Sequence, residues 1–317
     1  MKATLRNTAA LAMVFAGTLP AADSRLLSLV MPDATVIAGV NVTQAKASPF
    51  GQYVLTLIAP HEQQLQALTT LTGFDPRRDV TELLAATNRG TGSAAGLALA
   101  RGTFPVEAIT AAAWAAGVAT ETYKDAAILK SPEGLQGLAF LDSTLAVFGD
   151  VASVKGAIDR QSPEARRLSP AVVSRIAQLS AANDAWVLTT VAPAGLHLPS
   201  AAPMVPGLNV QALAQIQQAS VAVRFGANVT VTARAQVDTA QNAATLAGML
   251  QLLANVAQMQ AQKNPDAAAL AKSLNVAADG STVAVTFSMP EAQIRQLAQP
   301  RMRGRETAPH PAGQTSL

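Results

Sequence analysis

Cysteine is absent from all 317 residues of the chain. Its absence excludes disulfides, thiolate catalysis, cysteine-ligated zinc and iron–sulfur clusters. Aromatic residues make up only 4% of the sequence and histidine occurs three times, whereas 50% of the residues are hydrophobic. The sequence therefore predicts a core built mostly from alanine, leucine and valine, with few side chains suited to acid–base or metal chemistry.

Charged residues are also scarce, at 14% of the chain compared with about 25% in typical soluble proteins. A pI of 9.4 would suit a nucleic-acid partner, but the excess positive charge lies at the two ends of the chain. Lys2 and Arg6 give the first 22 residues a net charge of +2, and three arginines against Glu306 do the same for the C-terminal tail. Because the body between them is close to neutral, we expect no nucleic-acid partner.

The first 22 residues have the layout of a secretory signal peptide. Lys2 and Arg6 form a positive region, Ala9–Leu19 a short apolar run, and Ala21-Ala22 a cleavage site with small residues. The alternative interpretation is a buried N-terminal helix. Because the apolar run is shorter than the ~20 residues of a membrane-spanning helix, removal of the signal should leave a chain without a transmembrane segment. We predict an extracytoplasmic location, in the periplasm or secreted.

One order of elements, a hairpin followed by a helix, occurs twice. The hairpin at 136–148 leads into a helix that Asp150 can cap, and a second hairpin at 274–287 leads into a helix predicted at Pro290–Ala298. The repetition predicts an α+β fold with two related modules, each an antiparallel sheet with helices packed on one face. We further predict a short helix at Val80–Leu84 and a long one at Thr239–Gln260.

The chain is divided accordingly into a leader, two modules with a connector between them, and a tail. The predicted ranges are 1–22 for the signal peptide, 23–161 for the first α+β module, 162–181 for the helical connector, 182–299 for the second α+β module and 300–317 for a disordered tail.

Four short phrases in the first module combine turn and cap residues, namely Pro32-Asp33-Ala34, Gly39-Val40-Asn41, Ser48-Pro49-Phe50-Gly51 and Gly73-Phe74-Asp75-Pro76-Arg77-Arg78-Asp79. Together they resemble the opening of a group of exported bacterial proteins that has no assigned biochemical role. The resemblance implies a bacterial extracytoplasmic setting and an α+β fold. It implies no catalytic, cofactor or ligand residues.

No catalytic, metal or cofactor motif is complete. His61-Glu62 begins the zinc-protease pattern H-E-x-x-H, but Leu65 stands where the second histidine is needed. The glycine-rich stretch Gly90–Gly96 precedes a predicted strand, whereas a dinucleotide loop follows one. His197, in the Pro193–Gly207 loop, has no acid near it in an evident role. We therefore predict no metal, no cofactor and no enzymatic activity.

The densest charge cluster in the body consists of Asp75, Arg77, Arg78 and Asp79. In a functional interpretation the two arginines clamp an anion or a carboxylate. In a structural interpretation the two aspartates cap a turn and a short helix, and the arginines pair with them or face water. The structural interpretation is favoured, but the cluster is still the predicted contact surface.

Other polar and aromatic residues are interpreted structurally. The acids of the repeated units, Asp142, Asp150, Asp279 and Glu291, stand where a turn or a helix cap needs them. Trp114 and Trp186 have no aromatic neighbour in sequence and are predicted to be packing residues.

These observations favour an exported, non-enzymatic binding or structural protein of the bacterial cell envelope or secreted fraction, with an unknown protein partner. Two alternatives stay open. One is a carrier of a small apolar molecule or peptide, which would expose Met249, Leu252 and Met259 on the long helix. The other is a hydrolase with an unconventional site between the modules, under the Pro193–Gly207 loop, in a deep cleft that holds two or more buried charges.

Overall fold

The computed structural model describes residues 22–58, 62–88, 95–192, 216–259 and 273–293. Their strands form one antiparallel sheet of twelve strands, in the order β11-β12-β10-β9-β8-β1-β2-β3-β7-β6-β5-β4. In chain order the strands are β1 (Val36–Asn41), β2 (Val80–Asn88), β3 (Ala95–Gly102), β4 (Thr120–Tyr123), β5 (Ala126–Lys130), β6 (Gln136–Asp142), β7 (Leu145–Asp150), β8 (Ala185–Thr189), β9 (Ile216–Arg224), β10 (Asn228–Val237), β11 (Leu274–Asp279) and β12 (Thr282–Pro290).

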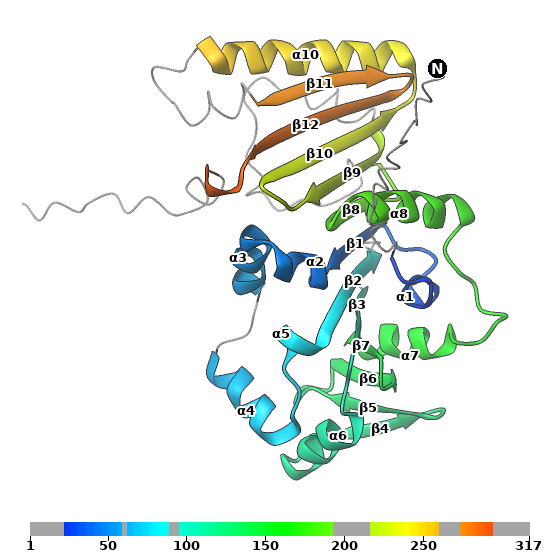
Figure 1. Cartoon of the computed structure of the whole chain (residues 1–317). Coiled ribbons are helices and arrows are strands. Elements are labelled where there is room, and N and C mark those ends of the chain that lie inside the picture. Colours follow the sequence, from blue (N-terminus) through cyan, green and yellow to red (C-terminus); the bar gives the residue numbers. More distant parts are fainter. Residues whose placement is uncertain (1–21, 59–61, 89–94, 193–215, 260–272, 294–317) are drawn as a thin grey trace, which may run out of the picture.

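Most of the helices gather around β1–β7, whereas α10 lies alone along the opposite end of the sheet (Figure 1). The helices are α1 (Ser24–Leu29), α2 (Val42–Ala47), α3 (Pro49–Ile58), α4 (Glu62–Thr72), α5 (Pro76–Asp79), α6 (Val106–Ala115), α7 (Val151–Asp159), α8 (Pro170–Ala182) and α10 (Ala240–Met259). Among these residues no helix is long and apolar enough to cross a membrane.

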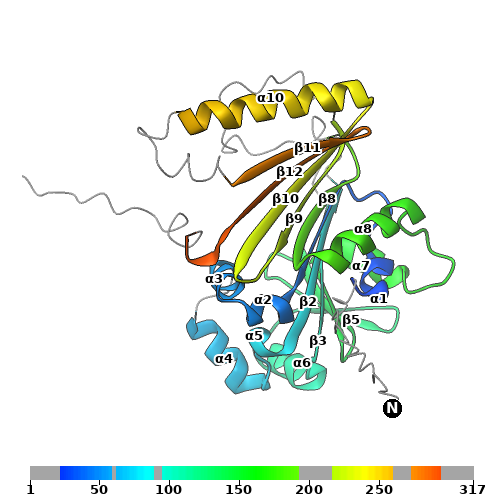
Figure 2. The same cartoon turned by 45° about the horizontal axis from the view of Figure 1, so that its top comes forward.

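The two halves of the sheet, β1–β7 and β8–β12, join where β1 pairs with β8. Ile37 lies opposite Leu188 and Gly39 opposite Trp186 across this seam. We predicted a separate sheet for each module, but the strands run on from one half to the other (Figure 2). The physical reason is that β1 and β8 each use both of their edges, so neither half is left with an open edge at the seam.

The helices lie on both faces of the sheet, which corrects the prediction of a single covered face. On one face, here called the α8 face, helices α1, α7 and α8 bury Ile37, Leu188 and Ala222 in the largest core cluster. On the other face, here called the α10 face, α10 covers a second cluster that includes Val276 and Val283.

The α10 face is also covered in the first half of the sheet. There Phe74, Phe104 and Phe140 pack with ring centroids 5.4 and 5.5 Å apart between successive pairs. Residues of α2, α4 and α6 complete this third cluster. On the α8 face of β10 and β12 the described residues form no such cluster, and there the strands present Thr230, Thr232, Arg234, Thr286 and Ser288.

Local predictions have mixed outcomes. Asp150 caps α7, its side chain accepting a hydrogen bond from the Ser153 N–H. The prediction of a helix at Val80–Leu84 is wrong, because this segment begins β2, where pairing with β1 and β3 overrides a short helical pattern. Trp186 is 4% exposed and belongs to the core, as predicted, whereas Trp114 is 61% exposed.

Only part of the helix predicted at Pro290–Ala298 lies within the described residues, which end at residue 293. Strand β12 continues to Pro290, where the predicted helix Pro290–Ala298 was to begin. Residues from 294 onward, the predicted signal peptide up to residue 21 and residues 193–215, which include the predicted Pro193–Gly207 loop, lie outside the described residues.

Candidate ligand-binding cleft

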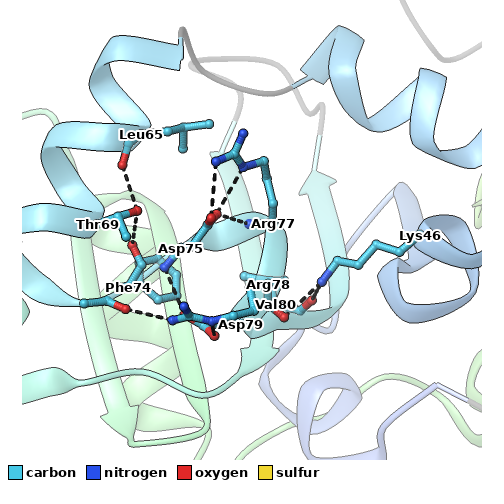
Figure 3. A network of polar contacts seen from close by, with 10 residues as sticks. Lys46, Leu65, Thr69, Phe74, Asp75, Arg77, Arg78, Asp79 and Val80 are labelled. Carbon is cyan, nitrogen blue, oxygen red and sulfur yellow. Dashed lines mark hydrogen bonds and ion pairs between the residues drawn. The ribbon is translucent and has the colours of Figure 1, made fainter.

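The predicted contact surface is an internally paired cluster around the short helix α5. Asp75 caps this helix, accepting a hydrogen bond from the Arg77 N–H, and Pro76 occupies its first turn. The Arg77 guanidinium turns back onto the Asp75 carboxylate at 3.2 Å (Figure 3). This side-chain hydrogen bond lowers the pKa of Asp75.

The second half of the cluster is paired in the same way. Arg78 donates to both Asp79 oxygens at 2.6 and 2.7 Å and to the Gly73 carbonyl at 2.8 Å. The hydrogen bond from Arg78 lowers the pKa of Asp79. Lys46 of α2 donates to the carbonyls of Arg78 and Val80, which ties the cluster to its neighbours (Figure 3). The structure thus gives each of the four charged residues an intramolecular partner, as in the structural interpretation, and the contact-surface role stays a prediction.

A different set of charges lines a cleft of about 420 Å³ between α8 and the α8 face of β9 and β10. Sequence reasoning did not single out these residues. Its described lining is Arg175, Gln178, Leu179, Ala182, Asn183, Arg224, Thr230, Thr232 and Arg234.

Helix α8 supplies one wall of the cleft because of how it begins, packs and ends. Ser169 caps it, accepting from the Val172 N–H at 3.3 Å, and Pro170 starts its first turn. Ile176 and Leu179 bury one side of the helix in the core of the first half. Arg175 and Gln178 therefore lie on a flank that points toward the neighbouring strands.

The strand wall follows from the alternation of side chains in β10, NVTVTARAQV. Val229, Val231 and Ala233 lie on the α10 face, so Thr230, Thr232 and Arg234 lie on the α8 face. Register continues this polar surface into the neighbouring strands, with Arg224 opposite Thr230 on β9 and Thr286 opposite Thr232 on β12. The alternation of apolar and polar residues in β9 and β10 is the sequence signal that could have identified these cleft residues.

The electrostatic character of the cleft is positive. Its described lining contains three arginines and neither a carboxylate nor a histidine. Within the described part of the chain, none of the three arginine side chains forms a hydrogen bond or ion pair, and the Nε of Arg175 is buried without a partner. An unsatisfied buried donor costs roughly 1–3 kcal/mol, so this atom favours an acceptor.

Asp184, which immediately precedes β8, is an acid that interacts with Arg224 of the cleft. Burial raises its pKa, against a hydrogen bond from the Phe225 N–H and the positive charge of Arg224. The Asp184 carboxylate accepts from the Phe225 N–H at 2.6 Å and is 4% exposed. Asp184 therefore stabilises the turn between β9 and β10 through this hydrogen bond, and it is not part of the lining of the cleft.

Several sequence candidates cannot be placed. His61, His197, His310 and the glycine stretch 90–94 lie outside the described residues. Among the residues that are described, no group of three or more histidines or acids lies close enough to hold a metal ion.

A third surface feature is an apolar stripe on α10. Leu252 is 63% exposed, Met259 76% and Val256 36%. Their spacing places them on one side of the helix, away from the buried side that carries Ala243 and Leu246. Met249 is half-buried at the end of this stripe.

Fold and cleft together define an α+β protein with one long antiparallel sheet and an arginine-lined hollow beside its seam. No protein-family model and no curated protein sequence matches the chain. The solved structures that match include three crystal forms of a protein named TP0453. Form III aligns with a TM-score of 0.56 at 10% identity, over 85% of this chain and 96% of that one.

The other two forms give similar values. Form I aligns with a TM-score of 0.52 at 9% identity and form IV with 0.52 at 12% identity, each covering 86% of this chain and 95% of the other. At such identities the likeness concerns the fold. It extends over both halves of the sheet, because the share of each chain covered is too large for one half alone.

Proposed function

We propose that the chain is an exported, non-enzymatic binding protein of the bacterial cell envelope or secreted fraction, and that its ligand occupies the cleft between α8 and β10. The observation that carries the proposal is the convergence of Arg175, Arg224 and Arg234 on this cleft, none of whose side chains is paired within the described part of the chain. Three unpaired guanidinium groups at one hollow favour a bound ligand, because their N–H donors need acceptors.

Further observations support the proposal. The leader at residues 1–22 has the order of charge, apolar run and small residues that export requires. The fold is similar to that of TP0453, so the likeness supports the fold, and the setting rests on the leader. The lining of the cleft, with arginines, amides and hydroxyls but neither carboxylate nor imidazole among its described residues, suits binding more than acid–base catalysis.

The test combines location and ligand capture. The full-length chain is expressed in a bacterial host, the cell fractions are separated, and small molecules that co-purify with the mature protein are measured by mass spectrometry. The matched variant is Ala182→Trp, which fills the cleft from an exposed position on α8 without changing charge. We expect the wild type in the extracytoplasmic fraction with a ligand that the variant lacks. The proposal is contradicted if the protein stays in the cytoplasm with its leader uncleaved. It is also contradicted if the same small molecules co-purify with the wild type and the variant.

A second candidate function is transport of a small apolar molecule or peptide. The exposed stripe of Leu252, Val256 and Met259 favours it, because contiguous exposed apolar surface is uncommon without a partner. A fluorescent apolar probe should then bind the wild type and lose most of its signal with the double variant Leu252→Gln/Met259→Gln. Equal fluorescence of the two proteins speaks against this role.

The related-module organisation also remains a proposal. Its support is the recurrence of an antiparallel hairpin at β6–β7 and at β11–β12, near the two ends of the sheet. The shared seam predicts that residues 23–161 and 182–299 unfold together in urea, and two separate transitions by intrinsic fluorescence and circular dichroism would indicate independent domains.

A further inference from the structure

Charge complementarity limits what the cleft can hold. A guanidinium presents its N–H donors in a planar fork that matches carboxylate and phosphate oxygens. Arg175 enters from α8, while Arg224 and Arg234 enter from adjacent strands on the same face. The described lining contains no carboxylate, and Asp184, which Arg224 attracts, is buried against Phe225. Arg175 and Arg234 therefore have no acidic partner in the lining and can attract a ligand.

The strand register places hydroxyl groups between two of the arginines. Arg224 lies opposite Thr230, and Arg234 lies four residues further along β10, with Thr232 between them. Four residues of strand span roughly 13 Å. A ligand that reaches from one end of the strand wall to the other therefore passes over both threonines.

These hydroxyls retain capacity for hydrogen bonding. Thr230 shares a 3.1 Å hydrogen bond with Ser288, and Thr232 a 3.4 Å one with Thr286. A hydroxyl has one donor and two acceptor sites, so neither pair is saturated by its own bond. Gln178 adds a side-chain amide from the helix wall. The body of the ligand thus meets polar groups on both walls.

From these contacts we infer that the cleft binds a small oxyanion with a hydroxyl-bearing body, of the class of sugar acids and sugar phosphates. The inference rests on the proposed binding function and names its ligand class. Arg175 and one of the strand arginines hold the carboxylate or phosphate, and Thr230 and Thr232, which lie between Arg224 and Arg234, receive the hydroxyls. The volume of about 420 Å³ lies within the range of pockets for small molecules.

The experiment measures binding by isothermal titration calorimetry on the mature full chain at fixed ionic strength. The probes are glucuronate, glucose 6-phosphate, glucose, inorganic phosphate and hexanoate. Glucuronate and glucose 6-phosphate separate the two possible anionic groups. Glucose removes the charge, while inorganic phosphate and hexanoate remove the hydroxyl-bearing body. We expect at least one charged sugar to bind tenfold or more tightly than all three of the others.

The variants test the residues. Arg175→Gln and Arg234→Gln should each weaken binding roughly tenfold, the scale of one charge-assisted hydrogen bond. Arg166→Gln is the matched control, because Arg166 is an exposed arginine in the segment before α8 and is not part of the lining. Its affinity should equal that of the wild type. Circular dichroism of each variant confirms that it is folded.

Three outcomes overturn the inference: neither charged sugar binds, glucose, phosphate or hexanoate binds as tightly, or Arg175→Gln leaves the affinity unchanged. These outcomes are distinct from failure of the proposed function. If the wild type yields a neutral or apolar co-purifying molecule that Ala182→Trp loses, the binding function stands and the oxyanion class is wrong. If Ala182→Trp changes nothing, the cleft is not the binding site.

Discussion

The seam between the two halves of the sheet predicts a specific clash. Gly39 in β1 lies directly beneath the indole of Trp186 in β8, and a Cβ added at Gly39 would lie 2.5 Å from the ring. Real Cβ atoms essentially never come so close. The ring cannot easily move away, because Trp186 is 4% exposed and packed in the main core cluster. Gly39→Ala should therefore destabilise the protein.

The size of the effect follows from two opposing terms. Overpacking of a well-filled core costs about 1–3 kcal/mol, and replacing glycine by alanine recovers about 0.4–1 kcal/mol by restricting the unfolded chain. We expect Gly39→Ala to lower the free energy of unfolding by about 1–2 kcal/mol. In a Trp186→Leu background the clash is gone, so the same substitution should cost nothing or stabilise slightly.

Urea unfolding of four proteins forms a double-mutant cycle: wild type, both single variants and the double variant. The coupling free energy between the two sites should be about 1–3 kcal/mol. Gly96→Ala in β3 is the control, since a Cβ there meets nothing within 4 Å. The reasoning is refuted if Gly39→Ala costs no more than Gly96→Ala, or if its cost persists unchanged in the Trp186→Leu background.

Three further predictions concern buried and capping carboxylates. Asp150→Ala should cost about 1–2 kcal/mol in urea unfolding, because Asp150 caps α7 and also accepts from the Gly96 N–H at 3.0 Å; an unchanged midpoint contradicts this. Although burial opposes ionisation of Asp142, hydrogen bonds from Thr144 and Arg25 lower its pKa from 3.8 to about 2. Its contribution is present above pH 3.8 and is lost as the pH falls toward 2, so the stability advantage over Asp142→Asn, below about 1 kcal/mol at this exposed pair, should narrow between pH 5 and pH 2. A constant difference would be inconsistent with the shift. Burial raises the pKa of Asp184, so its ionisation is a penalty that grows as the pH rises above 3.8. Asp184→Asn should then be at least as stable as wild type at pH 7 by thermal denaturation, and a less stable variant would show that the charge itself is needed.

Local features of the fold could be predicted from the sequence because their causes are local. The turn at Lys124-Asp125 between β4 and β5 follows from neighbouring residues, and the Asp150 cap needs only a side chain three residues from its donor. The DPRRD stretch likewise folds back on itself, so its pairing could be anticipated from spacing alone.

The sheet order could not be predicted because it depends on partners far apart in the chain. The seam joins Gly39 to Trp186, and the repeat pattern gave no indication that β1 and β8 would pair. The same limit applies to the cleft. Arg175, Arg224 and Arg234 come from three elements, and only the long-range packing of α8 against β8 and β9 brings them to one hollow.

The position of the cleft has a mechanical consequence. One of its walls is α8, which is embedded in the core of β1–β7, and the other is formed by β9 and β10, which belong to the far half of the sheet. Anything that twists the seam changes the span between Arg175 and the two strand arginines. A ligand that binds to both walls would connect the two halves of the sheet across the seam. The protein should therefore be most rigid in its ligand-bound state.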